Sequence, residues 1–120
     1  MRRLALILAC LASTPALAAG YPVAGRWGDV PNAPPGPADC SGKRVIAFNG
    51  DRRTDSGGGV PSYRLKSITP LGTHQWRVVD TFTNGQIRNG TVSHTLRQPD
   101  AEHLEMDLQR GGTLKLRKCK

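Results

Sequence analysis

The chain has 120 residues, with 17 lysines and arginines against 9 acidic residues, and a formal net charge of +8. A chain of this length forms one domain with a modest core, and no later segment holds the ~20 apolar residues that a membrane-spanning helix requires. The basic excess favours attraction to anionic partners, but charge alone specifies neither a fold nor a chemistry.

The first 18 residues have the pattern of an export signal. Two arginines at 2–3 precede an apolar run at 4–12, and Ala-Leu-Ala at 16–18 fits the rule for signal-peptidase cleavage. We predict a signal peptide over 1–18 and a periplasmic or secreted mature chain with charge +6, because the leader removes two of the +8 charges. A lipid anchor at Cys10 is the alternative, although the apolar run before it falls short of the usual ~7 residues.

Residues 19–42 are rich in proline, with four prolines between Pro31 and Pro37. This composition suits neither a helix nor a central strand, so we expect a segment that covers a β domain spanning residues 43–120. Cys40 and Cys119 are the two cysteines left after the leader, and in an oxidising compartment they predict a disulfide. Two free thiols are the alternative.

The first expected strand is Lys43 to Phe48, where Ile46 and Phe48 share one face, and Asn49-Gly50 ends it. The next stretch, residues 51–62, is polar and glycine-rich and predicts a mobile surface loop. Its adjacent arginines, Arg52 and Arg53, are the candidate residues for binding an anionic partner.

From Tyr63 onward, apolar residues alternate with polar ones in short runs. Turn-forming residues separate these runs at 70–72, 84–90, 99–100 and 111–112. No window shows a helical stripe, so the fold class we predict is all-β: a small antiparallel meander barrel or sandwich with one disulfide. The side chains expected in its core are Trp76, Phe82, Leu104, Met106, Leu114 and Leu116.

The last hairpin, residues 104–120, ends in a cluster of cations. A three-residue turn at 110–112 would place Leu108 opposite Leu114, with Lys115 and Arg117 on the outer face opposite Asp107 and Glu105. We therefore interpret these cations as a charged, solvent-exposed face of the hairpin, and an anion-binding site is the alternative.

Two polar residues fall on inward faces of the expected strands. Asp80 lies between Val78 and Phe82, and His94 lies within the next run. The two side chains therefore either form a hydrogen bond with each other or line a cavity. An odd-numbered loop brings them to one face, and a five-residue loop sets them directly opposite. Without a serine or cysteine nucleophile motif or metal-site spacing, the pair is more often structural than catalytic, so we expect no catalytic residue, metal or cofactor.

The stretch Gly25-Arg26-Trp27 precedes the first expected strands. It resembles the first motif of the lipocalins, whose tryptophan closes the base of a barrel and packs under a late cation, here Arg117. It also resembles the small secreted inhibitors of serralysin-type metalloproteases. The Thr-Asp-x-x-Tyr motif of lipocalins is absent, the mature chain is short for a roomy eight-stranded cup, and Cys40 and Cys119 lie further apart than the inhibitors' cysteines. An ordinary core role for Trp27 is the alternative.

These features lead to three functional hypotheses. The first is a non-enzymatic exported binding protein of the bacterial envelope, monomeric, with a small apolar ligand, a protein partner or an anionic envelope component as its partner. The second is a protease inhibitor that uses residues 19–25 or 51–62. The third is an enzyme that uses Asp80 and His94 as acid and base. Nucleic acid is not an expected partner.

Overall fold

The computed structural model describes residues 20–120; the predicted signal peptide and Cys10 lie outside this range. The described chain forms eight strands joined in sequence order. Their bounds are β1 Gly25–Gly28, β2 Val45–Asn49, β3 Arg52–Asp55, β4 Ser62–Gly72, β5 Gln75–Phe82, β6 Gly90–Asp100, β7 His103–Leu108 and β8 Thr113–Lys118.

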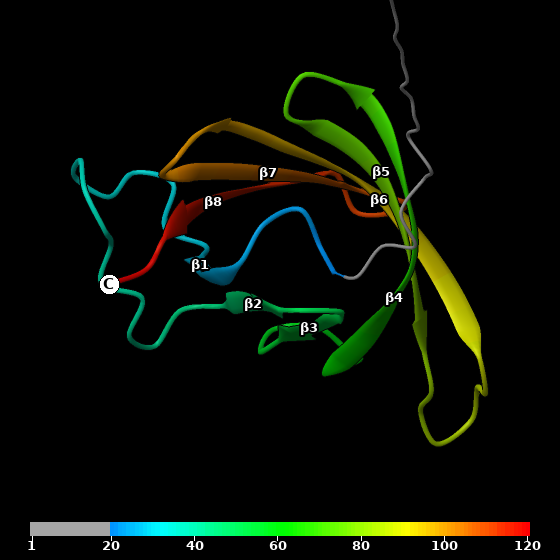
Figure 1. The fold of residues 1–120 in the computed structure, drawn as a ribbon. Coiled ribbons are helices and arrows are strands. Elements are labelled where there is room, and N and C mark those ends of the chain that lie inside the picture. The colour runs from blue at the N-terminus through cyan, green and yellow to red at the C-terminus, as the bar shows by residue number, and fades with distance from the viewer. Residues whose placement is uncertain (1–19) are drawn as a thin grey trace, which may run out of the picture.

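The eight strands close into one antiparallel barrel (Figure 1). Each strand pairs with the next, and β1 closes the circle by pairing with β8 through Trp27 and Lys118. The all-β class, the meander order and the single disulfide are confirmed, and of the two architectures expected the barrel is the one found. The part of the chain that the structure describes contains no helix that could cross a membrane.

The meander places alternate connections at opposite ends of the barrel. The β3–β4, β5–β6 and β7–β8 connections lie at one end, and the tighter β2–β3, β4–β5 and β6–β7 turns lie at the other. We call these the mouth and the base. Since β8 runs from the mouth to the base, Lys118 lies at the base.

Apolar side chains fill the base. Trp27 is 1 % exposed, its Nε1 donates a hydrogen bond to the carbonyl of Ala24 at 3.0 Å, and Nζ of Lys118 lies 5.1 Å from its ring centre. The cation over the tryptophan is therefore Lys118 and not Arg117. Gly25 adopts a φ of 93°, so the backbone conformation at this position favours glycine. The core around Trp27 comprises Ile46, Phe48, Val78, Leu96, Leu104, Met106 and Leu116.

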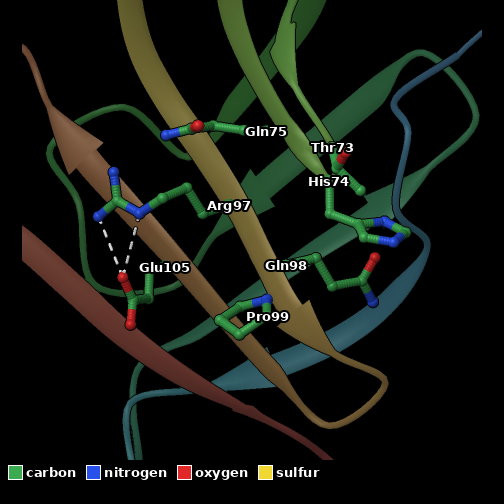
Figure 2. A pocket seen from close by; sticks show the side chains of 7 residues that line it. All are labelled: Thr73, His74, Gln75, Arg97, Gln98, Pro99 and Glu105. Carbon is green, nitrogen blue, oxygen red and sulfur yellow. Dashed lines mark hydrogen bonds and ion pairs between the residues drawn. The ribbon is translucent and has the colours of Figure 1, made fainter.

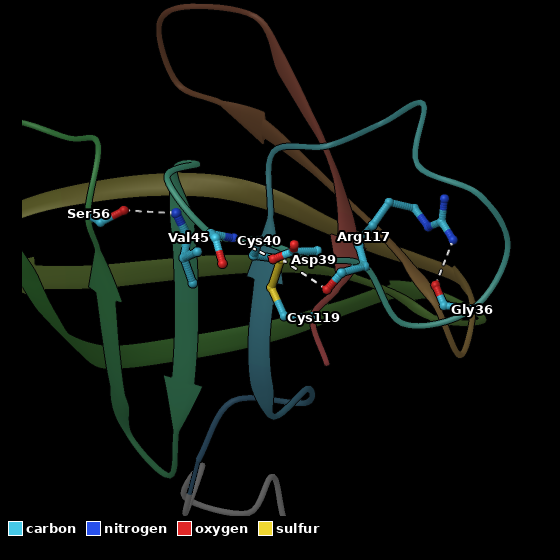
Figure 3. Close-up of a disulfide and its surroundings, with 9 residues drawn as sticks. Gly36, Asp39, Cys40, Val45, Ser56, Arg117 and Cys119 are labelled. Atoms are coloured by element: carbon cyan, nitrogen blue, oxygen red, sulfur yellow. Dashed lines mark hydrogen bonds between the residues drawn. A yellow bond between two sulfur atoms is a disulfide. The ribbon is translucent and has the colours of Figure 1, made fainter.

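The connection between β1 and β2 covers the outside of the barrel and is held at two points (Figure 3). The disulfide between Cys40 and Cys119 is present, with Cα atoms 5.8 Å apart. Arg117 forms the second point: it points outward from β8 but is only 4 % exposed, because the cover lies over it. Its guanidinium donates to three carbonyls of the cover, those of Ala33, Pro34 and Gly36.

Three expectations about element bounds need correction. Residues 19–42 are not only a cover, because β1 lies within them and completes the barrel wall. Residues 51–62 are not simply a mobile loop, because β3 occupies 52–55 and pairs with both β2 and β4. Strands β4 and β6 also extend through Pro70 and Pro99, where turns were expected. Both prolines lie beside shifts in strand register, where a missing N–H is tolerated.

The last hairpin keeps the expected inward face but with a different register. Met106 pairs with Leu114 and Leu104 with Leu116, so the strands are offset by two residues from the expected pairing. An offset of two preserves the face of every side chain. Leu104, Met106 and Leu116 are buried, Leu114 and Trp76 pack against the core as partly buried residues, and Phe82 is also partly buried.

The outer-face partners change with this register. Lys115 lies opposite Glu105, whereas Arg117 lies opposite His103 and Asp107 opposite Thr113. The expected pairs of Arg117 with Glu105 and of Lys115 with Asp107 are therefore wrong, and the buried Arg117 is not part of a solvent-exposed face.

Candidate functional site

The mouth of the barrel contains a pocket of about 620 Å³. Three connections contribute to its lining. The β3–β4 connection contributes Gly58 and Gly59, the β5–β6 connection contributes Ile87, and the β7–β8 connection contributes Gln109 and Arg110. Because the base is filled, the barrel is a cup open at one end. We call this cavity the mouth pocket.

Asp80 is the centre of a polar network below the mouth pocket. Its side chain is fully buried, and Oδ2 accepts hydrogen bonds from Nε and Nη2 of Arg53 at 3.0 and 2.7 Å. The hydroxyl of Tyr21 donates to Oδ1 at 2.5 Å. Burial raises the pKa of Asp80, while the positive charge of Arg53 and these hydrogen bonds oppose that rise. The net effect is a raised pKa, while the donors on both oxygens favour the ionised form of the carboxylate.

Tyr21 reaches this network from the segment before β1. Its backbone N–H donates to the carbonyl of Gly50 at 2.9 Å, which draws residues 20–24 along the β2–β3 turn. Its ring packs edge-on against Phe48 at 5.1 Å between centroids. Burial and the hydrogen bond to Asp80 raise the pKa of the Tyr21 hydroxyl, so it remains a donor at neutral pH.

Arg53 and His94 carry the network into the mouth pocket, since both line it. The guanidinium of Arg53 lies 3.9 Å from the ring centre of Tyr63, a favourable cation–π distance. His94 is 4 % exposed, and its Nδ1 lies 3.7 Å from Oδ2 of Asp80, too far for a hydrogen bond. Its Nε2 is buried without a hydrogen-bond partner among residues 20–120. Burial, aided by the charge of Arg53, lowers the pKa of His94 to about 3, so the ring is neutral at pH 7.

An apolar part of the wall adjoins this polar group, because Phe82 lies two residues beyond Asp80 on β5 and Leu108 pairs with His94. Phe82 packs edge-on against Tyr63 at 5.8 Å, and Val92, Leu108 and Ile87 complete the wall. Gly90 leaves room for this ring, because a Cβ at this position would lie 2.6 Å from Cζ of Phe82 and the ring would have to shift. Gly90 on β6 pairs with Phe82 on β5, and because glycine has no side chain the Phe82 ring can lie over it.

A second ion pair, between Arg44 and Asp55, lies at the rim of the mouth pocket. Nε and Nη2 of Arg44 donate to the two carboxylate oxygens of Asp55 at 2.9 and 2.7 Å, and the N–H of Gly57 donates to Oδ1 at 2.9 Å. Burial disfavours the charge on Asp55, but the hydrogen bonds from Arg44 and Gly57 outweigh it and lower the pKa of this carboxyl. This pairing holds the glycine-rich turn after β3 against the barrel.

The structure brings together three of the four residues singled out from the sequence as binding candidates. Arg53, Asp80 and His94 meet inside the barrel, whereas Arg52 lies exposed on the outer face of β3. Asp80 and His94 share a face as the odd-loop argument required, but Asp80 pairs with Val92 and the connection spans residues 83–89. Sequence reasoning missed Tyr21 entirely, because nothing in the segment before β1 signals an inward side chain.

The outside of the barrel has a second hollow, of about 300 Å³, over the β4–β5 turn (Figure 2). Its arginine, Arg97, already binds Glu105 through Nε and Nη2 and Asp107 through Nη1 and Nη2. The backbone N–H of Gln98 donates to the carbonyl of His74. This hollow is smaller than the mouth pocket and its arginine is already paired, so we take the mouth pocket as the candidate site.

No protein-family model, curated protein sequence or solved structure matches this chain. The site must therefore be interpreted from its own chemistry. It combines a neutral histidine, two paired arginines and other polar side chains with aromatic and aliphatic ones, a composition that allows non-covalent binding of a small molecule.

Proposed function

We propose that this protein is a non-enzymatic exported binding protein of the bacterial envelope that holds a small, largely apolar ligand in the mouth pocket. The observation that carries the proposal is the contrast between the two ends of the barrel: the base is packed, and the mouth holds about 620 Å³ of space. This volume lies within the range of ~300 to 1,000 Å³ that is common for pockets that bind small molecules.

The barrel also supports a lipocalin-like interpretation. Eight antiparallel strands in meander order, with Trp27 under a cation at the base, agree with the resemblance in the Gly25-Arg26-Trp27 stretch. A cup closed at one end by such a tryptophan leaves the other end for a ligand.

Protease inhibition has less support. An inhibitor of that kind would present its N-terminal residues to the protease, but Tyr21 and Val23 are buried in the core of this barrel. The other candidate segment, residues 51–62, contributes β3 to the barrel wall.

A neutral fluorescent probe, N-phenyl-1-naphthylamine, tests the proposal. We expect the parent protein to bind it with enhanced fluorescence, and Leu108→Trp to abolish binding because the larger side chain fills the pocket. Leu71→Trp is the matched control, since Leu71 is 48 % exposed in the β4–β5 region at the base. Circular dichroism verifies that both variants fold. Absence of probe binding to the parent, or equal binding by folded Leu108→Trp, would overturn the proposal.

A further inference from the structure

The polar groups of the mouth pocket indicate what kind of head group a ligand needs. Arg53 uses Nε and Nη2 to bind Asp80, and its Nη1 donates to no residue between 20 and 120. The two N–H groups of Nη1 therefore remain as donors on a side chain that lines the pocket. A ligand atom that meets either of them must be a hydrogen-bond acceptor.

His94 supplies the complementary group. Neutral imidazole has one N–H and one acceptor nitrogen. Nδ1 lies 3.7 Å from the Asp80 carboxylate, and the tautomer with the proton on Nδ1 places an N–H rather than a lone pair towards this negative charge. Nε2 is then an acceptor, and it is the buried nitrogen without a partner in the described chain. A ligand that satisfies it must donate a hydrogen bond.

Charge further restricts the head group. Arg53 and Asp80 form a neutral pair, and His94 is uncharged. A carboxylate or phosphate would bring a second negative charge next to Asp80. The charge of Arg53 is already paired with Asp80, and that of Arg44, which also lines the pocket, is paired with Asp55. Burying an anion without its own counter-charge is costly. Arg110 is exposed at the rim, where water screens its attraction for anions.

We propose that the mouth pocket is selective for neutral amphipathic alcohols, whose hydroxyl group accepts from Arg53 and donates to Nε2 of His94 while the hydrocarbon chain lies against the apolar wall. This inference rests on the proposed function and specifies its ligand class. A hydroxyl group is the smallest neutral group that both accepts and donates. The wall of Phe82, Val92 and Leu108 provides the matching apolar surface.

Three ligands with the same chain length test the inference by displacement of N-phenyl-1-naphthylamine. These are 1-decanol, methyl decyl ether, which accepts but cannot donate, and decanoate, which is charged. We expect 1-decanol to bind the parent about tenfold more tightly than either of the others, as one hydrogen bond to a buried group provides. In His94→Leu, 1-decanol and the ether should bind equally, because the acceptor is gone.

A spectroscopic measurement on the parent makes the test independent of whether His94→Leu folds. The ¹⁵N resonance of Nε2 of His94 should move on addition of 1-decanol and should not move with the ether. Tighter binding of decanoate than of 1-decanol, equal binding of 1-decanol and the ether to the parent, or failure of all three to displace a bound probe would each overturn the inference and leave the proposed function standing. If the probe itself does not bind, the proposed function fails.

Discussion

Arg53 and Asp80 form an ion pair inside the barrel, with Nη2 2.7 Å from Oδ2 and side chains that are 5 % and 0 % exposed. The pair joins β3 to β5, two strands separated by β4 in the barrel order. It therefore links these two strands across the interior of the barrel, just below the mouth pocket.

Breaking this pair on one side should be strongly destabilising. Asp80→Asn leaves the charge of Arg53 buried without a counter-charge, which costs about 3 to 5 kcal/mol of unfolding free energy. The double variant Arg53→Met with Asp80→Leu should lose less than Asp80→Asn alone. Urea unfolding measures both. The exposed pair Arg64–Asp51 is the control, and Arg64→Ala should cost less than about 1 kcal/mol. A loss of that small size for Asp80→Asn would contradict the assigned role.

His94 should make stability depend on pH. Burial lowers its folded-state pKa from 6.5 to about 3, so between these values the unfolded chain binds a proton that the folded chain does not. Its contribution to stability is complete above pH 6.5 and is lost as pH falls towards 3, at about 1.4 kcal/mol per pH unit. Between pH 6.5 and 5 the parent should lose about 2 kcal/mol more than His94→Gln does. Parallel pH profiles for the two proteins would contradict a buried neutral His94.

The disulfide should provide a large share of the stability. Cys40 and Cys119 are separated by 79 positions, and closing a loop of this length in the unfolded chain is worth about 4 to 5 kcal/mol on the chain-entropy account. We expect the double variant Cys40→Ser with Cys119→Ser to lose about 3 to 5 kcal/mol in urea unfolding. Adding a reductant should bring the parent to the same midpoint and leave the variant unchanged.

Shortening an apolar side chain in the packed base should lower the free energy of unfolding. Leu104 is 0 % exposed, and Leu104→Ala should cost about 2 to 5 kcal/mol through lost burial and the cavity left behind. Leu71 is 48 % exposed, so Leu71→Ala should stay within about 0.5 kcal/mol of the parent. Similar losses for the two variants would mean that the inward face of β7 is assigned wrongly.

Sequence alternation predicted the faces of the later strands well, because inward and outward side chains alternate along each barrel strand. It placed Asp80 and His94 on one face, although both the β5–β6 and the β7–β8 registers were offset by two residues. The longer connections, 83–89 and 109–112, explain the offset. Loop length sets the register, and the sequence does not fix where a loop of glycine and polar residues begins.

Alternation failed at β3 for a physical reason. Its sequence, Arg-Arg-Thr-Asp at 52–55, has no apolar residue, yet Arg53 and Asp55 point inward and are buried. Each is neutralised by a distant partner, Asp80 for Arg53 and Arg44 for Asp55. Such pairing depends on the closed barrel and cannot be read from local composition, so the candidate site was found only in part.

The location of ligand binding is the central claim, and an NMR titration of ¹⁵N-labelled protein with N-phenyl-1-naphthylamine tests it most directly. We predict that the largest changes in backbone amide shifts occur at Val92, His94 and Leu108, which line the mouth pocket, and that residues 73–75 over the outer hollow stay unchanged. Changes centred on residues 73–75, with Val92, His94 and Leu108 unaffected, would contradict the account.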